Sequence, residues 1–299
     1  MFKIKTFKIL LFALSIMLFS CKEEETNSLD ENLTFAVNFT ADGDFKKANN
    51  HLERAFEQAG ENLNENLYLV KAKIQALQSK PIDEILTSLR KALKYAPKNY
   101  LANFEIGEIL YKQKKYDDSI ISLKNAIKCD KTQSAPVLIL AEIYKNLKQP
   151  KESLKYYGKL LNMENYKVKK IDEKITDKKE KKKAKAAAEL YNKKITAELY
   201  NEIGCRYLEI GKNKKNIENA VKYIYLKAYP LDKKNHQIIL NIATLCDIYL
   251  NKPKIAVEYY AKYWKMTRKN PQSYDLLKKV EARVLELDPT RVKKVNELR

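Results

Sequence analysis

The stretch Ile106–Ala126, IGEILYKQKKYDDSIISLKNA, decides the fold, because its pattern of large and small residues returns at a fixed distance along the chain. Adding 34 to the positions of Ile106 and Gly107 gives Leu140 and Ala141. Shifts of 34 residues in either direction pair Ser119 with Ser153, Leu123 with Tyr157 and Leu89, Ala126 with Leu160 and Ala92, and Tyr116 with Ile82. Three consecutive units therefore share one register without gaps, which is typical of a repeat protein.

The alternative fold is an ordinary helical bundle. A bundle predicts apolar residues at the helical period, but it does not predict a register fixed over tens of residues. The composition agrees with long helices in either case, because the chain has only 6 glycines and 8 prolines among 299 residues. The fixed register favours a stack of similar helix pairs.

The pattern resembles the tetratricopeptide repeat, a pair of antiparallel helices that stacks on its neighbours. That family has a large residue followed by a small one in the first helix, an aromatic three residues later, small and large residues alternating on the second helix, and a polar or proline-containing turn. The matching residues here are Ile106-Gly107, Leu140-Ala141 and Ile203-Gly204; Tyr144 and Tyr207; Ala48, Leu52 and Ala55; Ser119, Leu123 and Ala126; and Ala96–Asn99 and Asp288-Pro289. Small residues let two helices approach, and large ones fill the neighbouring unit's holes.

The resemblance implies an all-α fold, a right-handed α-solenoid of about six tetratricopeptide helix pairs with a C-terminal capping helix. We expect units 1–4 in residues 33–165, a lysine-rich helical insertion in 166–196, and units 5–6 with the cap in 197–299. Within unit 5, an insertion around Lys212–Asn219 is expected to delay the second helix. The amphipathic segment Tyr274–Leu287 is the expected cap, which a solenoid end needs to cover its last apolar face.

Residues 1–20 have the features of a secretory signal peptide. Lysines 3, 5 and 8 precede the apolar run Ile9–Phe19, whose 11 residues are too few for an ordinary membrane span. The sequence Leu18–Cys21 resembles the lipobox of bacterial lipoproteins, which implies cleavage before Cys21 and lipidation of its thiol. A plain signal peptide or an uncleaved anchor is the alternative. We expect a polar tether over residues 21–32 and a membrane-anchored lipoprotein of the cell envelope, in the outer membrane and either periplasmic or surface-exposed.

The formal net charge is +20, and residues 166–185 alone contain ten lysines and four acids. Attraction to an anionic envelope polymer or lipid is the functional interpretation of this charge. Solvation of helix surfaces is the alternative, and the spread of lysines along the whole chain favours it. We expect no nucleic-acid partner.

The sequence contains no recognisable catalytic or metal-binding pattern. The four cysteines form no CxxC pair and have no zinc-type spacing with histidine, and no phosphate-binding, dinucleotide, nucleophile-elbow or HExxH motif occurs. His51 is expected on the exposed side of a helix and His236 at a helix start, so neither is a good candidate base. We therefore expect neither an enzyme nor a cofactor. Cys205 and Cys246 are expected on adjacent first helices, where a disulfide is an alternative to two free thiols.

The expected function is protein binding through a groove lined by the first helix of each pair, so that the chain acts as a scaffold or adaptor for a protein or peptide. Counting from the packing pairs gives candidate groove residues with aromatic rings and both charge signs, which suits a peptide with apolar side chains. These residues are Leu101, Phe104, Glu108, Tyr111, Lys112, Leu138, Glu142, Lys145, Asn146, Asn201, Cys205 and Leu208. Packing of Leu101 and Phe104 against the neighbouring unit is the alternative.

Overall fold

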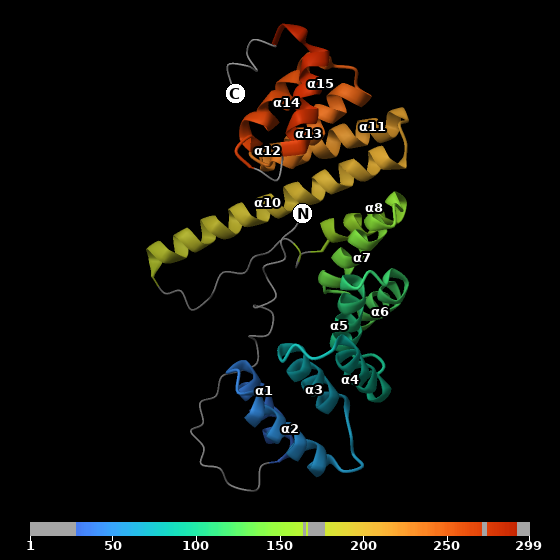
Figure 1. Cartoon of the computed structure of the whole chain (residues 1–299), viewed down its shortest axis with the longest axis vertical. Helices are drawn as coiled ribbons and strands as arrows, with labels where there is room; N and C mark the ends of the chain where they lie inside the picture. The colour runs from blue at the N-terminus through green and yellow to red at the C-terminus, as the bar shows by residue number, and fades with distance from the viewer. Residues whose placement is uncertain (1–27, 164–165, 167–176, 271–273, 292–299) are drawn as a thin grey trace. The chain divides into compact units, whose positions relative to one another are not determined.

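The computed structural model describes residues 28–163, 166, 177–270 and 274–291. The signal peptide, Cys21 and most of the expected tether lie outside the described residues. Contact clustering divides the chain into two compact units, residues 1–85 and 86–299, and each is described by itself. All regular elements of the described residues are helices (Figure 1). None of them combines the length and apolar character that a bilayer-spanning helix needs.

The first unit contains α1 (Leu29–Ala41), α2 (Phe45–Ala59), α3 (Glu65–Leu77) and the start of α4 (Ile82–Tyr95). Its core includes the expected packing residues of α2, because Ala48, Leu52 and Ala55 are all buried. Helix α1 begins at Leu29, so residues 29–32 are helical and the expected tether boundary at residue 32 is wrong. The cause is a capping box: the Glu31 amide donates to Ser28 Oγ, and the Ser28 amide donates to the Glu31 carboxylate.

His51 also departs from its expected place. Its ring is half-buried between α1 and α2, stacked 5.4 Å from the Phe39 ring, and its Nδ1 lies 2.8 Å from Asn32 Oδ1. The expectation of an exposed His51 is therefore wrong, because α1 covers this face of α2. The contacts are those of a packing residue.

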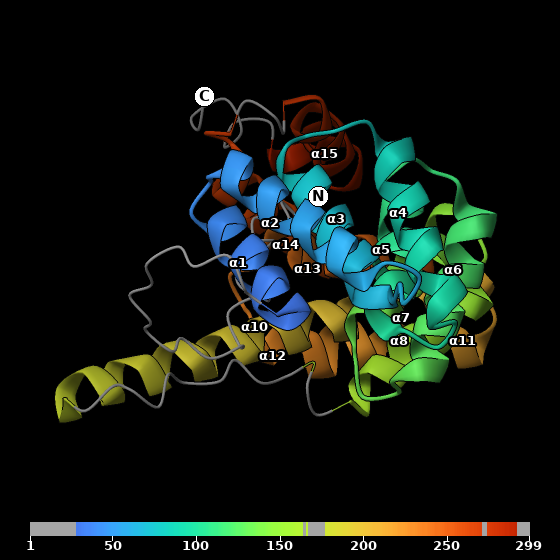
Figure 2. The ribbon, with the colours of Figure 1, turned by 90° about the horizontal axis from the view of Figure 1, so that it is seen from below.

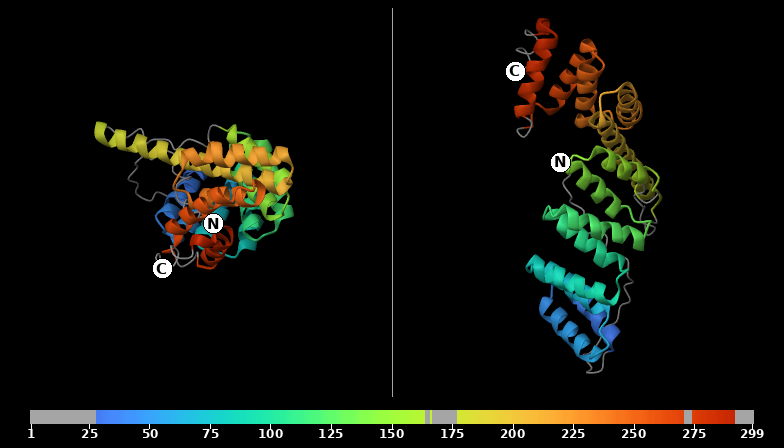
Figure 3. Two further views of the ribbon diagram at one scale, coloured as in Figure 1. Left: turned by 90° about the horizontal axis from the view of Figure 1, so that it is seen from above. Right: turned by 90° about the vertical axis from the view of Figure 1, so that its right-hand side faces the viewer.

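The second unit contains the rest of α4 and three pairs of helices followed by a cap (Figure 3). Its elements are α5 (Tyr100–Lys112), α6 (Tyr116–Cys129), α7 (Ala135–Asn146), α8 (Pro150–Leu161), α10 (Lys178–Ile210), α11 (Lys214–Ala220), α12 (Tyr229–Leu231), α13 (His236–Thr244), α14 (Pro253–Thr267) and α15 (Tyr274–Leu287), with two π-helical segments, η1 (Val221–Ala228) and η2 (Leu245–Tyr249), and the 3-10 turn η4 (Pro289–Arg291). Helix pairs α5/α6, α7/α8, α10 with α11 and η1, and α13 with α14 pack against each other. The capping helix α15 has the bounds expected from the sequence.

Small residues allow close contact within each pair, as the 34-residue pattern predicts. Gly107 and Gly204 face the side chains of Leu123 and Ile224 so closely that a Cβ atom would lie 2.7 Å and 2.4 Å from them. Buried serines add a bond at the same step of two successive pairs. Ser119 donates to the Gly107 carbonyl at 2.6 Å, and 34 residues later Ser153 donates to the Ala141 carbonyl at 2.9 Å. The repeat is therefore conserved at the level of single hydrogen bonds.

The turns inside the pairs repeat one backbone device. A residue with positive φ follows the first helix at Gly43, Ser79, Lys114, Lys148 and Asn251. At Lys114 and Lys148 the next amide bonds back to the carbonyl five residues earlier, from Lys115 to Leu110 and from Gln149 to Tyr144. This left-handed cap ends a helix and reverses the chain, so the second helix runs back along the first.

The fifth pair differs from the expectation of an insertion at Lys212–Asn219. Helix α11 already begins at Lys214, where the Asn213 side chain accepts from the Asn216 amide at 2.9 Å. The extra residues are taken up instead by the wider turns of η1, since a π-helix absorbs residues without leaving the helix. The expectation of one long helix leading into this pair is confirmed, because α10 runs for 33 residues.

The cap α15 is attached by a buried carboxylate on η2. Asp247 accepts from Arg283 Nη2 at 2.8 Å and Nε at 2.9 Å, and from the Tyr260 hydroxyl at 3.1 Å. The Arg283 hydrogen bonds, with help from Tyr260, hold the Asp247 pKa below its ordinary value, although burial acts in the opposite direction. A carboxyl with a depressed folded-state pKa adds stability above its unfolded pKa, about 4, and loses it as the pH falls further.

We therefore expect Asp247→Asn to destabilise the cap at pH 7, and the difference from wild type to shrink towards zero as the pH falls below about 4. Thermal unfolding and hydrogen exchange of α15 between pH 7 and pH 3 measure it. Glu258→Gln, at an exposed acid on α14, is the matched control. A difference that stays constant over this pH range would show that Asp247 does not act through its charge.

Candidate functional site

The expected groove residues of the second unit lie on α5, α7 and the C-terminal part of α10, which are the first helices of their pairs. The packing pairs Ile106-Gly107, Leu140-Ala141 and Ile203-Gly204 are all buried and fix the rotation of these helices. The neighbouring face of each helix is consequently less buried. We call the side chains on this face of α5, α7, α10 and α13 the first-helix row.

On α5 the row combines an exposed residue with half-buried aromatic rings. Leu101 is 41% exposed, whereas Phe104 is half-buried, stacks 5.7 Å from the Tyr100 ring and packs against the core cluster around Leu123 and Leu140. The packing alternative therefore holds in part for Phe104. One turn further on, Glu108 and Lys112 form an ion pair with 3.0 Å between Oε1 and Nζ.

The row continues from α5 to α7 through Tyr111. This ring is half-buried and tilted against Tyr116 at 6.2 Å, and Asn146 on α7 donates to the Tyr116 hydroxyl at 3.4 Å. Burial raises the pKa of Tyr111, and the Glu142 carboxylate raises it further. Tyr111, Glu142 and Asn146 are thus neighbours, as the sequence predicted.

Between α7 and α10 the row carries a chain of paired charges. Lys145 Nζ lies 3.7 Å from the Glu142 carboxylate on its own helix and 2.9 Å from the Glu202 carboxylate on α10. Glu142 also accepts from the buried Tyr157 hydroxyl of α8, whose pKa is raised by burial and then by Glu202 and Glu142. The two expected residues Glu142 and Lys145 are therefore brought together, and each has an opposite charge or a donor beside it.

Arg206 is the residue at this junction that the sequence pattern did not single out. It lies three positions after Ile203, where the other pairs have the fully buried apolar residues Ile143 and Leu245, and it is itself only 5% exposed. Its Nη2 donates to Glu209 at 2.7 Å, while its Nε and Nη1 are buried without a hydrogen-bond partner among the described residues. A buried guanidinium with unmet donors is costly, so this position departs from the apolar rule of the repeat.

The row reaches α13 through asparagine side chains. Asn241 Nδ2 lies 2.8 Å from Asn201 Oδ1 and 3.2 Å from Cys205 Sγ. Burial raises the pKa of the Cys205 thiol to about 12, with Glu202 adding to the effect, so it stays protonated at neutral pH. Cys205 and Cys246 are free thiols in this structure, so the disulfide alternative is not formed. Leu208 packs against the core that α10 shares with α13 and α14.

Sequence reasoning missed Glu202, Asn241, Arg206 and Tyr157. Glu202 and Asn241 share one signal, because each stands directly before a packing pair, Ile203-Gly204 or Ile242-Ala243. The count from the packing pairs left out that position. Leu138, which the count did include, is half-buried and packs against the cluster around Val137 and Tyr157. It contributes to the core between neighbouring pairs.

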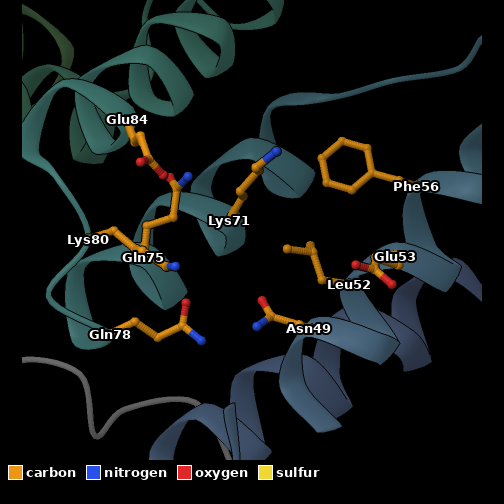
Figure 4. Close-up of a pocket in the computed structure, with 9 residues that line it drawn as sticks. All are labelled: Asn49, Leu52, Glu53, Phe56, Lys71, Gln75, Gln78, Lys80 and Glu84. Carbon is orange, nitrogen blue, oxygen red and sulfur yellow. The ribbon is translucent and has the colours of Figure 1, made fainter. Parts of the chain in front are cut away.

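A separate pocket lies within the first unit, between α2 and α3 (Figure 4). Leu52 and Phe56 supply its apolar wall, and the Lys71 ammonium lies 5.6 Å from the centre of the Phe56 ring. The remaining lining consists of amides and charged side chains of both signs: Asn49, Glu53, Gln75, Gln78, Lys80 and Glu84. It holds no cysteine, serine or histidine, so it has no nucleophile activated by a base.

Metal chemistry finds no support in the part of the chain that the structure describes. Within those residues, no group of three His, Cys, Asp or Glu side chains is placed to hold a metal ion. His236 is exposed at the start of α13, as expected, and its ring centre lies 6.2 Å from that of Tyr263.

No family model and no curated protein matches the sequence. The fold, in contrast, resembles solved structures. PilF of Pseudomonas aeruginosa is 15% identical with a TM-score of 0.52, and the match covers 84% of this chain and 97% of that one. A MamA double mutant from Desulfovibrio magneticus RS-1 is 14% identical with a TM-score of 0.50, covering 69% and 96%.

Both are tetratricopeptide-repeat proteins, so the likeness concerns the fold. At this identity it carries no information about the partner or the pathway. The all-α tetratricopeptide solenoid fold expected from the sequence, with helix pairs and a C-terminal cap, is confirmed.

Proposed function

We propose that the protein is a non-catalytic scaffold, anchored in the cell envelope as a lipoprotein, that binds a protein segment in a groove lined by the first-helix row. The observation that carries this proposal is the continuity of the row from α5 to α13. It runs from Tyr111 to Asn146, from Lys145 to Glu202 and from Asn201 to Asn241. Scaffolding is also the common use of the tetratricopeptide fold.

The chemistry of the row favours a polypeptide over a polyanion. Its cations Lys112 and Lys145 are already neutralised by glutamates within 3.0 Å, so they offer little attraction to a chain of negative charges. Exposed Leu101 and the partly exposed Tyr111 ring offer apolar contact, and the amides of Asn146 and Asn241 can bond to a backbone. An extended or helical segment with apolar side chains meets all three demands.

The envelope address rests on the sequence alone. The run from Lys3 to Phe19 resembles a signal peptide, and Leu18–Cys21 resembles a lipobox. A lipid on Cys21 would tether the helical part to a membrane through the polar residues that follow. Placement in the outer membrane is part of this proposal.

Leu101→Glu combined with Tyr111→Ala is expected to lose the native partner, because it places a charge on the exposed part of the row and removes an aromatic contact. Pull-down from native membranes with quantitative mass spectrometry measures it, and we expect at least about a tenfold loss, as for a binding hot spot. Leu101 is 41% exposed, so the fold should survive, whereas Phe104→Ala/Tyr111→Ala also removes core packing and needs a melting curve beside it.

Ile121→Glu is the matched control, since Ile121 is 61% exposed on the second helix α6. The control should retain every partner of the wild type. If the Leu101 and Tyr111 variant keeps its fold and all partners, the first-helix row is not the binding surface.

A further inference from the structure

The first half of α10 has few neighbours, although it belongs to the longest helix described. The contacts of α10 with α8, α11, η1, α12 and α13 coincide with its buried residues, which run from Ala197 to Arg206 apart from the single residue Ala188. Figures 1 and 2 show the N-terminal half extending beyond the neighbouring helices of the second unit. From Lys178 to Lys194 this amounts to about 25 Å of helix.

This half of α10 is strongly basic. It holds eight lysines, Lys178, Lys179, Lys181, Lys182, Lys183, Lys185, Lys193 and Lys194, against the two acids Glu180 and Glu189. All eight lysines are exposed. Only Lys193 forms an ion pair with a described residue, at 2.8 Å from Glu189, so seven positive charges lack a salt-bridge partner there.

The arrangement of these lysines opposes helix stability. Lys178 and Lys182, Lys179 and Lys183, and Lys181 and Lys185 are like charges four residues apart on one helix. Several of them also occupy the first turns, where the positive end of the helix dipole disfavours cations. The Asp177 cap, which accepts from the Glu180 amide at 2.7 Å, offsets only part of this. A helix needed only for solubility would gain from acids at this end.

The exposed face also carries apolar groups. Leu190 is 54% exposed and lies at helical spacing from Lys183, Ala186, Ala187 and Lys194, on the side away from buried Ala188. A single leucine among long lysine stems is suited to an interface where the ammonium groups meet anionic headgroups and the apolar atoms enter the lipid boundary. A soluble polyanion would use the charges and leave Leu190 exposed.

We propose that the face of α10 between Lys178 and Lys194 docks on the anionic phospholipid surface of a bilayer. The face would orient the protein on the membrane, and the first-helix row would remain available to a protein partner. This site is independent of the proposed groove. It is also independent of lipidation at Cys21, because docking concerns where the helix lies and not whether the chain is anchored.

Lysine acetylation footprinting tests the proposal on the full chain. The protein is reconstituted into vesicles of phosphatidylcholine alone or of phosphatidylcholine with phosphatidylglycerol, and mass spectrometry follows acetylation at each lysine. On the anionic vesicles we expect Lys178–Lys185 to react at least about fivefold more slowly than on neutral ones, and about 0.5 M NaCl to remove the difference. Equal rates on the two vesicle types would overturn the proposal.

Two charge-matched variants separate this face from the general charge of the chain. One replaces lysines 178, 179, 181, 182 and 183 with glutamine, and the other replaces the exposed lysines 214, 215, 233, 234 and 254. Protection of Lys185, Lys193 and Lys194 should vanish in the first variant and persist in the second. Loss in both variants, or protection by soluble polyphosphate but not by vesicles, would overturn docking on lipid.

Discussion

Gly107→Leu is expected to destabilise the second unit by about 1–3 kcal/mol, although leucine favours helices more than glycine does. A Cβ atom at Gly107 would lie 2.7 Å from Leu123 Cγ and Cδ2 and 3.2 Å from the Leu123 amide nitrogen. Leu123 is fully buried and belongs to the cluster formed with Leu140 and Ile143, so it has no room to move aside. Helices α5 and α6 would have to separate, which would also stretch the bond from Ser119 to the Gly107 carbonyl.

Thermal unfolding by circular dichroism measures this effect, and a loss of that size lowers the melting temperature by roughly 2–4 °C per kcal/mol for a unit of this length. Gly158→Ala is the matched control, because Gly158 lies inside α8 and a Cβ there meets nothing within 4 Å. The control should gain about 0.5–1 kcal/mol from helix propensity alone. A higher melting temperature for Gly107→Leu would contradict the close packing of the pair.

Cys21→Ser is expected to abolish lipidation completely, because a serine hydroxyl does not replace the thiol that carries the lipid. Cells grown with a fatty-acid analogue should label the wild type and leave the variant unlabelled. The variant should also shift out of the membrane fraction or keep its uncleaved leader. Measurement of the label after purification is independent of where the protein lies.

Cys129→Ser provides the control, since Cys129 is a half-buried free thiol in α6, far from the N-terminal run. Its labelling should equal that of the wild type. Label that persists on Cys21→Ser would refute the lipobox interpretation, and the envelope address would then need another anchor.

The parts of the fold that follow from local pattern could be predicted from the sequence. Gly107 and Leu123 were identified because the 34-residue register places a small residue opposite a large one, and the structure puts them in contact. The cap Tyr274–Leu287 followed from its amphipathic period. The helix start at Leu29 could also have been predicted, since Ser28 and Glu31 form a capping-box sequence.

The parts that depend on pairing between distant units could not be predicted in this way. Lys145 and Glu202 are 57 residues apart, and Asn201 and Asn241 are 40 apart, so no periodic rule joins them. Arg206 breaks the apolar rule at a buried position, which a pattern search treats as an exposed residue. The π-helical turns of η1 absorb residues that the pattern assigned to a loop.

The most direct test of protein binding by the first helices is site-specific photo-crosslinking in native membranes. A photoreactive benzoylphenylalanine is placed at Leu101 on α5 in one protein and at Ile121 on α6 in another, both exposed positions. We expect Leu101 to give a crosslinked adduct with a defined partner, which mass spectrometry identifies, and Ile121 to give none. Adducts at Ile121 and none at Leu101 would contradict a binding surface on the first helices.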